Sequence, residues 1–250
     1  MDVKTAGRVI DLFEVFATLK RPATLSELSR EMEIPVSSCF NLLKTIENRG
    51  YLYAVKPRGG VYPTKRILEL ARVIAANDPI ASRVSPVLQA LRDESGETIV
   101  FAKRRDTHVI YLDVLESPHR IRYSAQIGEV REMYSNSIGK AIMAQLPVEE
   151  RHALYAKMSM KKHTPATLTT RRDLDADIEK SLKRGWFSNV GETVTDVMSV
   201  AVPVAIAGDL CGISLVGPIH RMKPELQRHI ERIQRAAKAI ATAAEEGTSH

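Results

Sequence analysis

The chain has 250 residues, 44% of them hydrophobic and 26% charged, and its 36 basic and 30 acidic residues give a formal net charge of +6. This balance excludes wholesale disorder, and no run of about 18 apolar residues is present that could cross a membrane. Two distant cysteines, Cys39 and Cys211, and no apolar leader at the start favour a reduced, cytoplasmic protein without a metal site or another cofactor.

The first elements of the chain are two short helices. Apolar residues at helical spacing predict a helix over residues 9–19, which must end before Pro22. Thr24 and Glu27 follow the capping-box pattern, in which the hydroxyl and the carboxylate each bind the other residue's backbone amide. A second helix is therefore expected to begin directly after Thr24.

A third helix and a hairpin come next. Pro35 suits the first turn of a helix and Gly50 suits the residue just after its end. The segments 51–55 and 61–63 are typical of strands, and the turn-rich residues 56–60 between them are basic. Three short helices and a basic hairpin indicate a winged helix-turn-helix, whose third helix enters the major groove of DNA.

Positive charge is concentrated in this part of the chain. Between residues 20 and 66 there are nine basic and four acidic residues, a net charge of +5 in under a fifth of the sequence, which is expected of a phosphate-binding surface. The alternative is a helical protein-interaction module whose basic residues are merely solvated. The residues expected to contact DNA are Thr24, Ser37, Ser38, Asn41, Lys44 and Thr45, with Lys56 and Arg58 on the wing.

A linker helix is predicted between the two halves of the chain. Apolar residues between 67 and 74 are interrupted by Asn77, Asp78 and Pro79. The apolar face of this helix must either dock on its own domains or pair with the same helix of a second chain. A dimer would present two recognition helices about one DNA turn apart, as proteins that bind palindromes do.

The remaining residues predict an α+β domain. Hairpins dominate its pattern, so the sheet should be mainly antiparallel with helices packed on it. No nucleophile elbow, P-loop or dinucleotide-binding motif is present, so we expect no enzyme. Strands are predicted over 98–102, 109–115, 121–127, 186–190, 197–204 and 210–216, and helices over 79–94, 138–146, 148–158, 170–185 and from 224 onward.

One helix start in this domain is a candidate ligand site. Asn136 is a good N-cap, and the amides of Ser137 and Ile138 would then point out of the positive end of a helix, where a carboxylate could bind. The alternative is that Asn136 and Ser137 do no more than cap the helix.

Taken together, short segments in order along essentially the whole chain resemble the isocitrate-lyase-regulator (IclR) type of bacterial transcription factor. The resemblance implies a winged helix-turn-helix over residues 1–63, a linker helix over 64–78 and a GAF- or PAS-like effector domain over 79–250. It also implies dimers or tetramers that bind double-stranded operator DNA. The segments include Thr24-Leu25-Ser26-Glu27-Leu28, Arg49-Gly50-Tyr51-Leu52, Gly139-Lys140-Ala141 and Ser214-Leu215-Val216-Gly217-Pro218.

The resemblance further implies control of a catabolic operon in response to a small organic acid, often aromatic or 2-oxo. Asn189 stands where members often carry Asp, and Ser199 where they often carry Cys, so an anionic ligand is still expected but its identity stays open. Two other classes stay open: a small-molecule enzyme or binding protein with an accessory helical domain, and an interaction module without a ligand. The implied effector-binding residues are Ser137, Ile138, Asn189, Val197, Ser199, Ser214 and Val216.

Overall fold

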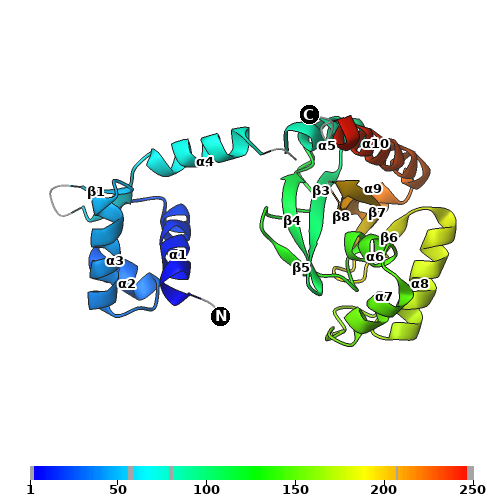
Figure 1. Ribbon diagram of the computed structural model, residues 1–250, viewed down its shortest axis with the longest axis horizontal. Helices are drawn as coiled ribbons and strands as arrows, with labels where there is room; N and C mark the ends of the chain where they lie inside the picture. The colour runs from blue at the N-terminus through cyan, green and yellow to red at the C-terminus, as the bar shows by residue number, and fades with distance from the viewer. Residues whose placement is uncertain (1–2, 56–58, 79–80, 207, 247–250) are drawn as a thin grey trace. The chain divides into compact units, whose positions relative to one another are not determined.

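The first helix of the chain begins a small helical unit with its own core. The structure, a computed structural model, describes residues 3–55, 59–78, 81–206 and 208–246. It divides into two units, Met1–Asp78 and Pro79–His250, and each has a separate hydrophobic core. Figure 1 shows the helical first unit in blue to cyan and the second unit, which is built around a sheet, in green to red.

The first unit follows the predicted order of helices and strands. Leu12 and Phe16 of its first helix are buried in one apolar cluster with Leu28 of the second helix and Leu43 of the third. This order and packing are those of a winged helix-turn-helix. The described elements are α1 (Lys4–Leu19), α2 (Leu25–Glu31), α3 (Val36–Asn48), β1 (Leu52–Ala54), β2 (Val61–Pro63) and α4 (Arg66–Ala76).

Local signals set the ends of these helices. The Glu27 amide donates to Thr24 Oγ1 at 3.3 Å and the Thr24 amide donates to Glu27 Oε2 at 2.8 Å, so the predicted capping box is confirmed. The Thr24 amide, and next the Arg21 guanidinium, lower the pKa of Glu27 to about 2. Gly50 follows α3 with φ of 77°, a left-handed conformation that favours glycine.

The wing is joined to the helices through the backbone. β1 and β2 pair antiparallel, and Ala23, between α1 and α2, exchanges backbone hydrogen bonds of 3.2 and 2.9 Å with Val61. Gly60 has φ of 78°, and a Cβ on it would lie 2.0 Å from the Ala23 carbonyl oxygen. A glycine is therefore required where the hairpin meets the helices.

Helix α4 forms where a linker helix is predicted, and it leaves its apolar residues uncovered within its own unit. Leu68, Leu70, Val73 and Ile74 are between 45% and 64% exposed, and α4 contains no buried residue. An amphipathic helix is normally stabilised by packing its apolar face.

The second unit contains one antiparallel sheet, as predicted. Its strands lie in the order β5-β4-β3-β8-β7-β6, and every neighbouring pair is antiparallel. The described elements are α5 (Ala81–Ser95), β3 (Thr98–Arg105), β4 (His108–Leu115), β5 (Val130–Glu132), α6 (Ser137–Met143), α7 (Val148–Tyr155), α8 (Arg171–Arg184), β6 (Phe187–Val190), β7 (Val197–Ile206), β8 (Asp209–Pro218), α9 (Ile219–Met222) and α10 (Leu226–Glu246).

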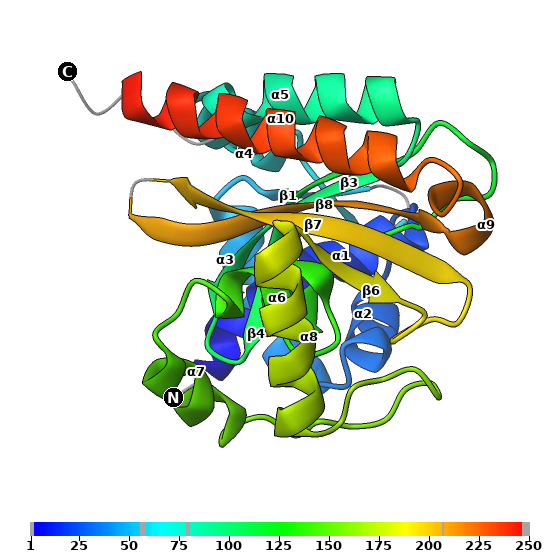
Figure 2. The ribbon, with the colours of Figure 1, turned by 90° about the vertical axis from the view of Figure 1, so that its right-hand side faces the viewer.

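Alternating side chains divide this sheet into two faces with different covers. On one face, Ile99 belongs to a cluster with Leu88 of α5 and Ile233 of α10. On the other, Val100 belongs to a cluster with Ile138 of α6. Figure 2 shows α5 and α10 side by side over the first face, and α6 and α8 on the second. The candidate effector residues belong to the second face.

One predicted strand is wrong. Residues 121–127 form no strand; Ile121 and Ile127 are 72% and 65% exposed in a loop. The edge strand is β5 instead, which pairs with β4. The apolar residues of the loop suggested a strand, whereas Val130 to Glu132 is too short and polar to be found by an alternation pattern.

Candidate functional site

Helix α3 has one buried face and one exposed polar face. Cys39, Leu42, Leu43 and Ile46 point into the core of the first unit. The predicted DNA-contacting residues of this helix lie on the other side, where Ser37, Asn41, Lys44 and Thr45 are exposed and Ser38 is half-buried. The structure therefore brings these five residues together on one surface, and their contact with DNA stays a prediction.

The start of α3 also exposes apolar side chains. Val36 is 52% exposed and Phe40 is 54% exposed, so Phe40 does not cover the core. An exposed ring of this kind can contact a thymine methyl group or stack on a base. Cys39 packs inward as predicted, and burial raises the pKa of its thiol, which makes it a poor nucleophile.

The other predicted DNA-contacting residues differ in position. Thr24 is exposed, but its hydroxyl already bonds the Glu27 amide and carboxylate in the capping box. Lys56 and Arg58, predicted at the wing tip, lie outside the described residues. Among the described residues, α3 thus carries most of the candidate DNA-binding surface.

The second unit contains a polar pocket of about 160 Å³ on the sheet face that α6 covers. Strands β4, β5, β6, β7 and β8, the start of α6 and four loops all contribute to its wall. Five of the seven predicted effector-binding residues are among those that line it. The lining residues are Tyr111, Tyr123, Arg131, Glu132, Ser135, Asn136, Ser137, His163, Asn189, Thr193, Val194, Ser199, Ser214 and Val216.

Asn136 caps α6 as predicted, with a consequence for the carboxylate site. Its Oδ1 accepts from the amides of Ile138 at 2.9 Å and Gly139 at 3.3 Å. The Ile138 amide is therefore not free to bind a ligand, which corrects the expectation that it points into the site. Helix α6 spans only Ser137 to Met143, so its dipole is small as well.

The interior of the pocket is rich in hydroxyl groups. Ser199 Oγ donates to Ser137 Oγ at 2.7 Å, and both residues are buried, as is Ser214. The strand register explains this grouping, because Ser199 of β7 faces Val216 of β8 and Asn189 of β6. Asn189, Ser199 and Val216 therefore meet although they come from three different strands.

Asn189 orients the loop after β6. Its Nδ2 donates to the Ser135 carbonyl at 2.5 Å, and its Oδ1 accepts from the Glu192 amide at 2.9 Å. Both ends of the side-chain amide are thus engaged within the protein. Asn189 lines the pocket but acts on it mainly by fixing the two segments it joins.

Two predicted effector residues do not line the pocket. Ile138 is 1% exposed, and its Cγ2 lies against Gly212, so its side chain belongs to the core. Val197 is half-buried at the edge of the same core and is not among the lining residues. Ile138 follows Ser137 on α6 and points away from the pocket, whereas Val197 shares the face of Ser199 but lies at the first position of β7.

Several lining residues had no sequence signal that pointed to them. Tyr111 and Tyr123 come from β4 and the loop after it, and Arg131 comes from the short strand β5 that the pattern missed. Glu132 and His163 pair at 2.8 Å on the pocket wall. Only the strand pairing and loop packing bring these groups together.

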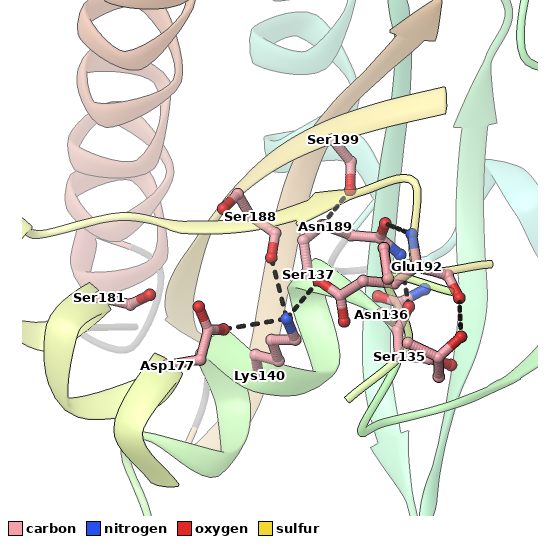
Figure 3. Close-up of polar contacts among 12 residues, drawn as sticks. Ser135, Asn136, Ser137, Lys140, Asp177, Ser181, Ser188, Asn189, Glu192 and Ser199 are labelled. Atoms are coloured by element: carbon pink, nitrogen blue, oxygen red, sulfur yellow. Dashed lines mark hydrogen bonds and ion pairs between the residues drawn. The ribbon is translucent and has the colours of Figure 1, made fainter. Parts of the chain in front are cut away.

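A buried lysine lies directly behind the pocket (Figure 3). Lys140 Nζ donates to Glu192 at 2.6 Å, to Asp177 at 2.9 Å and to the Ser188 carbonyl at 3.2 Å, and its side chain is 1% exposed. These partners belong to three different segments: α8, β6 and the loop after β6. Lys140 thus ties α6 to the loop that contributes Thr193 to the pocket wall.

The same loop is held from outside by two buried threonines. Thr164 Oγ1 donates to the Gly191 carbonyl and Thr167 Oγ1 to the Glu192 carbonyl, both at 2.6 Å. One oxygen of the Glu192 carboxylate, Oε2, is buried without a hydrogen-bond partner. Burial raises the pKa of Glu192, and the Lys140 ammonium acts in the opposite direction.

Two features are absent from the described residues: a cluster of metal-ligating side chains and a membrane-spanning helix. No group of three or more His, Cys, Asp and Glu side chains placed to hold a metal ion occurs among them. None of the helices in the described ranges is long and apolar enough to cross a membrane.

Two family descriptions match this chain. "IclR helix-turn-helix domain" matches residues 5–56, and "Bacterial transcriptional regulator IclR C-terminal" matches residues 73–242. The transcriptional repressor IclR of Escherichia coli K12 is 27% identical over 224 residues, which are 88% of this chain and 82% of that protein. The relatives are transcriptional regulators, in agreement with the prediction that the chain is not an enzyme.

Solved structures share the fold. The Thermotoga maritima IclR matches with a TM-score of 0.79 at 21% identity, covering 96% of each chain. An IclR homologue from Microbacterium hydrocarbonoxydans, crystallised with 4-hydroxybenzoate, matches with a TM-score of 0.77 at 20% identity, covering 97% of this chain and 99% of that one. These likenesses confirm the predicted fold of both units.

Proposed function

Because the chain belongs to the IclR family of bacterial transcriptional regulators, we propose that it controls a catabolic operon in the cytoplasm by binding a palindromic operator. In this proposal, a small organic acid in the pocket of the second unit changes the affinity for DNA. The observation that carries the DNA-binding half is the exposed polar face of α3 in a winged helix-turn-helix.

Within this face, two side chains have different roles. Lys44 is a flexible cation suited to phosphate oxygens, which carry no sequence information. Asn41, one helical turn earlier, has an amide that can both donate to and accept from an adenine edge. Ser37 and Ser38 at the start of α3 would bind phosphate, and Thr45 is exposed on the same helix.

Lys44→Ala should weaken binding to specific and random DNA alike. It should also reduce the slope of log affinity against log salt by about 1, because one phosphate contact is lost. Asn41→Ala should instead relax the preference at one base pair by about 1–3 kcal/mol while leaving the salt slope unchanged. Fluorescence anisotropy with the operator and a scrambled duplex at several salt concentrations measures both effects.

Lys180→Ala is the matched control, since Lys180 is an exposed lysine on α8 of the second unit. It should leave both the affinity and the salt slope unchanged. If Lys44→Ala and Asn41→Ala both behave like this control, α3 is not the recognition helix.

We further propose that the protein acts as a homodimer or tetramer. The exposed apolar residues of α4 support this, because a second chain would cover them. An effector shifts such an assembly only if it binds one arrangement of the effector domains more tightly than another. Helix α4 would carry that change to the spacing of the two recognition helices.

The size of the pocket supports a small effector. Its 160 Å³ is close to the roughly 150 Å³ cavity that accommodates one benzene ring. A single-ring aromatic acid or a short 2-oxo acid fits this volume, and the homologue bound to 4-hydroxybenzoate supports the aromatic class. Ser137, Ser199, Ser214 and Val216 would contact the ligand, and Asn189 would shape the wall.

A saturating acid should raise the melting temperature of the second unit. At a hundred times its dissociation constant a ligand stabilises by about 2.7 kcal/mol, which corresponds to a shift of a few degrees. Ser199→Leu and Ser214→Leu should abolish the shift, since each fills the pocket with an apolar side chain. The measurement is a thermal-shift screen of aromatic, 2-oxo and aliphatic carboxylates.

Thr242→Leu is the control for this screen, because it replaces an exposed hydroxyl on α10 and should keep the full shift. The absence of a shift with every acid would overturn the effector proposal and favour a regulator with another signal. Chemical turnover of an acid, without affinity for DNA, would instead favour the small-molecule enzyme.

A further inference from the structure

The polar residues of the pocket form two groups on opposite sides of it. Arg131 and Tyr111 come from β5 and β4, at one side of the sheet, whereas Ser199 comes from β7. Three strand spacings separate β4 from β7 in the sheet order, about 14 Å between backbones. A ligand between the two groups can therefore meet different chemistry at each of its ends.

The first group contains a guanidinium and several donors, beside the carboxylate of Glu132, which pairs with His163. Arg131 is the only arginine or lysine among the described lining residues. Its Nη2 is paired with Glu129, but a guanidinium has five N–H donors, so several remain available. Planar guanidinium groups match carboxylates in a bidentate arrangement.

Two phenols complete the first group. The Tyr111 hydroxyl accepts from Asn136 Nδ2 at 3.0 Å, and its own proton can be donated to the neighbouring Tyr123 phenol or to a ligand. Burial, and next the neighbouring Tyr123 phenol, raise the pKa of Tyr111 far above its ordinary value. The hydroxyl therefore stays protonated, and it can donate to an anion beside Arg131.

The second group is neutral. Ser137, Ser199 and Ser214 are at most 7% exposed, and the Ser199 hydroxyl donates to that of Ser137. The Ser137 hydroxyl keeps its own proton for a ligand, while the Ile138 amide is bound to Asn136. A buried carboxylate is stabilised best by a cation, and the serine group contains none. These hydroxyls therefore suit an uncharged hydroxyl or oxo group better than a carboxylate.

We propose that the effector is an acid with two polar ends, whose carboxylate binds Arg131, Tyr111 and Tyr123 and whose hydroxyl or oxo group binds Ser137 and Ser199. This inference rests on the proposed effector function of the pocket. It reverses the orientation expected from the helix start, where the carboxylate would lie on the α6 amides. Arg131 is then the residue that selects acids, and the serines select among them.

Three probes separate the two ends: benzoate has only the carboxylate, phenol only the hydroxyl, and 4-hydroxybenzoate both. Binding to the full-length protein is measured by isothermal titration calorimetry. Arg131→Gln should weaken benzoate and 4-hydroxybenzoate about 10- to 100-fold, as expected for loss of a charge-assisted contact, and leave phenol unchanged. Ser199→Ala should remove the preference for 4-hydroxybenzoate over benzoate and leave benzoate unchanged.

Two further variants control for a general loss of positive charge and for disturbed folding. Arg105→Gln removes an exposed arginine from the end of β3 and should bind all three probes like the wild type. Arg131→Lys keeps the charge without the planar fork, so it should fall between the wild type and Arg131→Gln. This gradation would not follow from a general disturbance of folding.

Two results would overturn this inference. If Arg131→Gln binds both acids normally and Ser199→Ala weakens benzoate as much as 4-hydroxybenzoate, the carboxylate lies on the serine side and the inference is overturned, while the effector function stands. If the wild type binds none of the acids in this assay or in the wider thermal screen, the effector function fails, and this inference fails with it.

Discussion

Replacing Lys140 with methionine should lower the free energy of unfolding of the second unit by about 3–5 kcal/mol, the usual effect of breaking a buried ion pair. Methionine fills a similar volume but leaves Glu192 without its 2.6 Å partner. One oxygen of that carboxylate is already buried without a hydrogen bond. Nothing in the described loop offers a substitute cation.

The chain has a single tryptophan, so the free energy of unfolding can be measured for the second unit alone. Trp186 packs against the core of the second unit, and the Arg184 guanidinium lies 3.6 Å from its ring centroid. Its emission during urea titration therefore reports the second unit. Lys180→Met, which removes an exposed lysine from α8, should change the free energy by less than about 0.5 kcal/mol.

The stability lost in Lys140→Met should increase as the pH rises. Burial already raises the pKa of Glu192, and removing Lys140 raises it further. The folded variant then keeps a proton that the unfolded chain releases above its ordinary pKa of 4.5. A group that binds more protons when folded loses stability as pH rises, so the deficit of Lys140→Met should grow from acid to neutral pH.

A second substitution tests whether the ion pair between Lys140 and Glu192 accounts for the lost stability. Glu192→Gln in the Lys140→Met background removes the unpaired charge and should recover part of the stability, with a non-additive coupling between the two changes. Strict additivity, together with a deficit that does not change with pH, would show that Lys140 contributes only packing.

Replacing Gly60 with alanine should destabilise the first unit by about 2–5 kcal/mol and reduce DNA affinity. Its left-handed conformation alone costs a residue with a side chain about 1–2 kcal/mol. In addition, the new Cβ would lie 2.0 Å from the Ala23 carbonyl oxygen and 2.3 Å from its carbon. Backbone cannot yield as a side chain does, so the bridge between Ala23 and Val61 should break.

Two other glycines of the same unit separate these contributions. Gly50 also has a positive φ, but a Cβ would meet only Arg66 Nη1 at 3.5 Å, so Gly50→Ala should show the conformational term alone. Gly7 lies in α1 with nothing within 4 Å, and alanine there should stabilise the helix by about 1 kcal/mol.

Hydrogen exchange of the peptide that covers α3, followed by mass spectrometry, measures the stability of this unit without interference from the other. The expected order of protection is Gly7→Ala, wild type, Gly50→Ala and Gly60→Ala. Equal protection in Gly50→Ala and Gly60→Ala would mean that the wing can move away from the Ala23 carbonyl without a loss of stability.

Features that depend on neighbours in the chain were predictable from the sequence. The Thr24–Glu27 capping box, the Asn136 cap and the left-handed Gly50 each involve residues within a few positions of one another. Backbone geometry determines such contacts locally. The same holds for the three helices and the hairpin, whose order in the chain indicated DNA binding before any contact was known.

The missed strand and the two residues that do not line the pocket each depend on contacts that the sequence pattern does not show. β5 is only three residues long, so its conformation comes from pairing with β4 rather than from an apolar pattern. Arg131 lies on it and thus escaped detection. Ile138 was assigned to the pocket through its amide, which the Asn136 side chain binds instead, and Val197 through its place at the start of a strand, where its side chain packs against the core.

The sequence by itself thus determined the two-part organisation and the surface of α3, because periodicity and capping act over a few residues. The class of regulator followed from a resemblance carried by short segments along the whole chain. Only the tertiary structure decided which polar side chains pair with one another in and around the pocket. Lys140 and Glu192 are 52 positions apart, and Ser137 and Ser199 are 62 apart. Such pairs meet through the order and register of six strands, and no local pattern encodes which distant side chains that register will bring together.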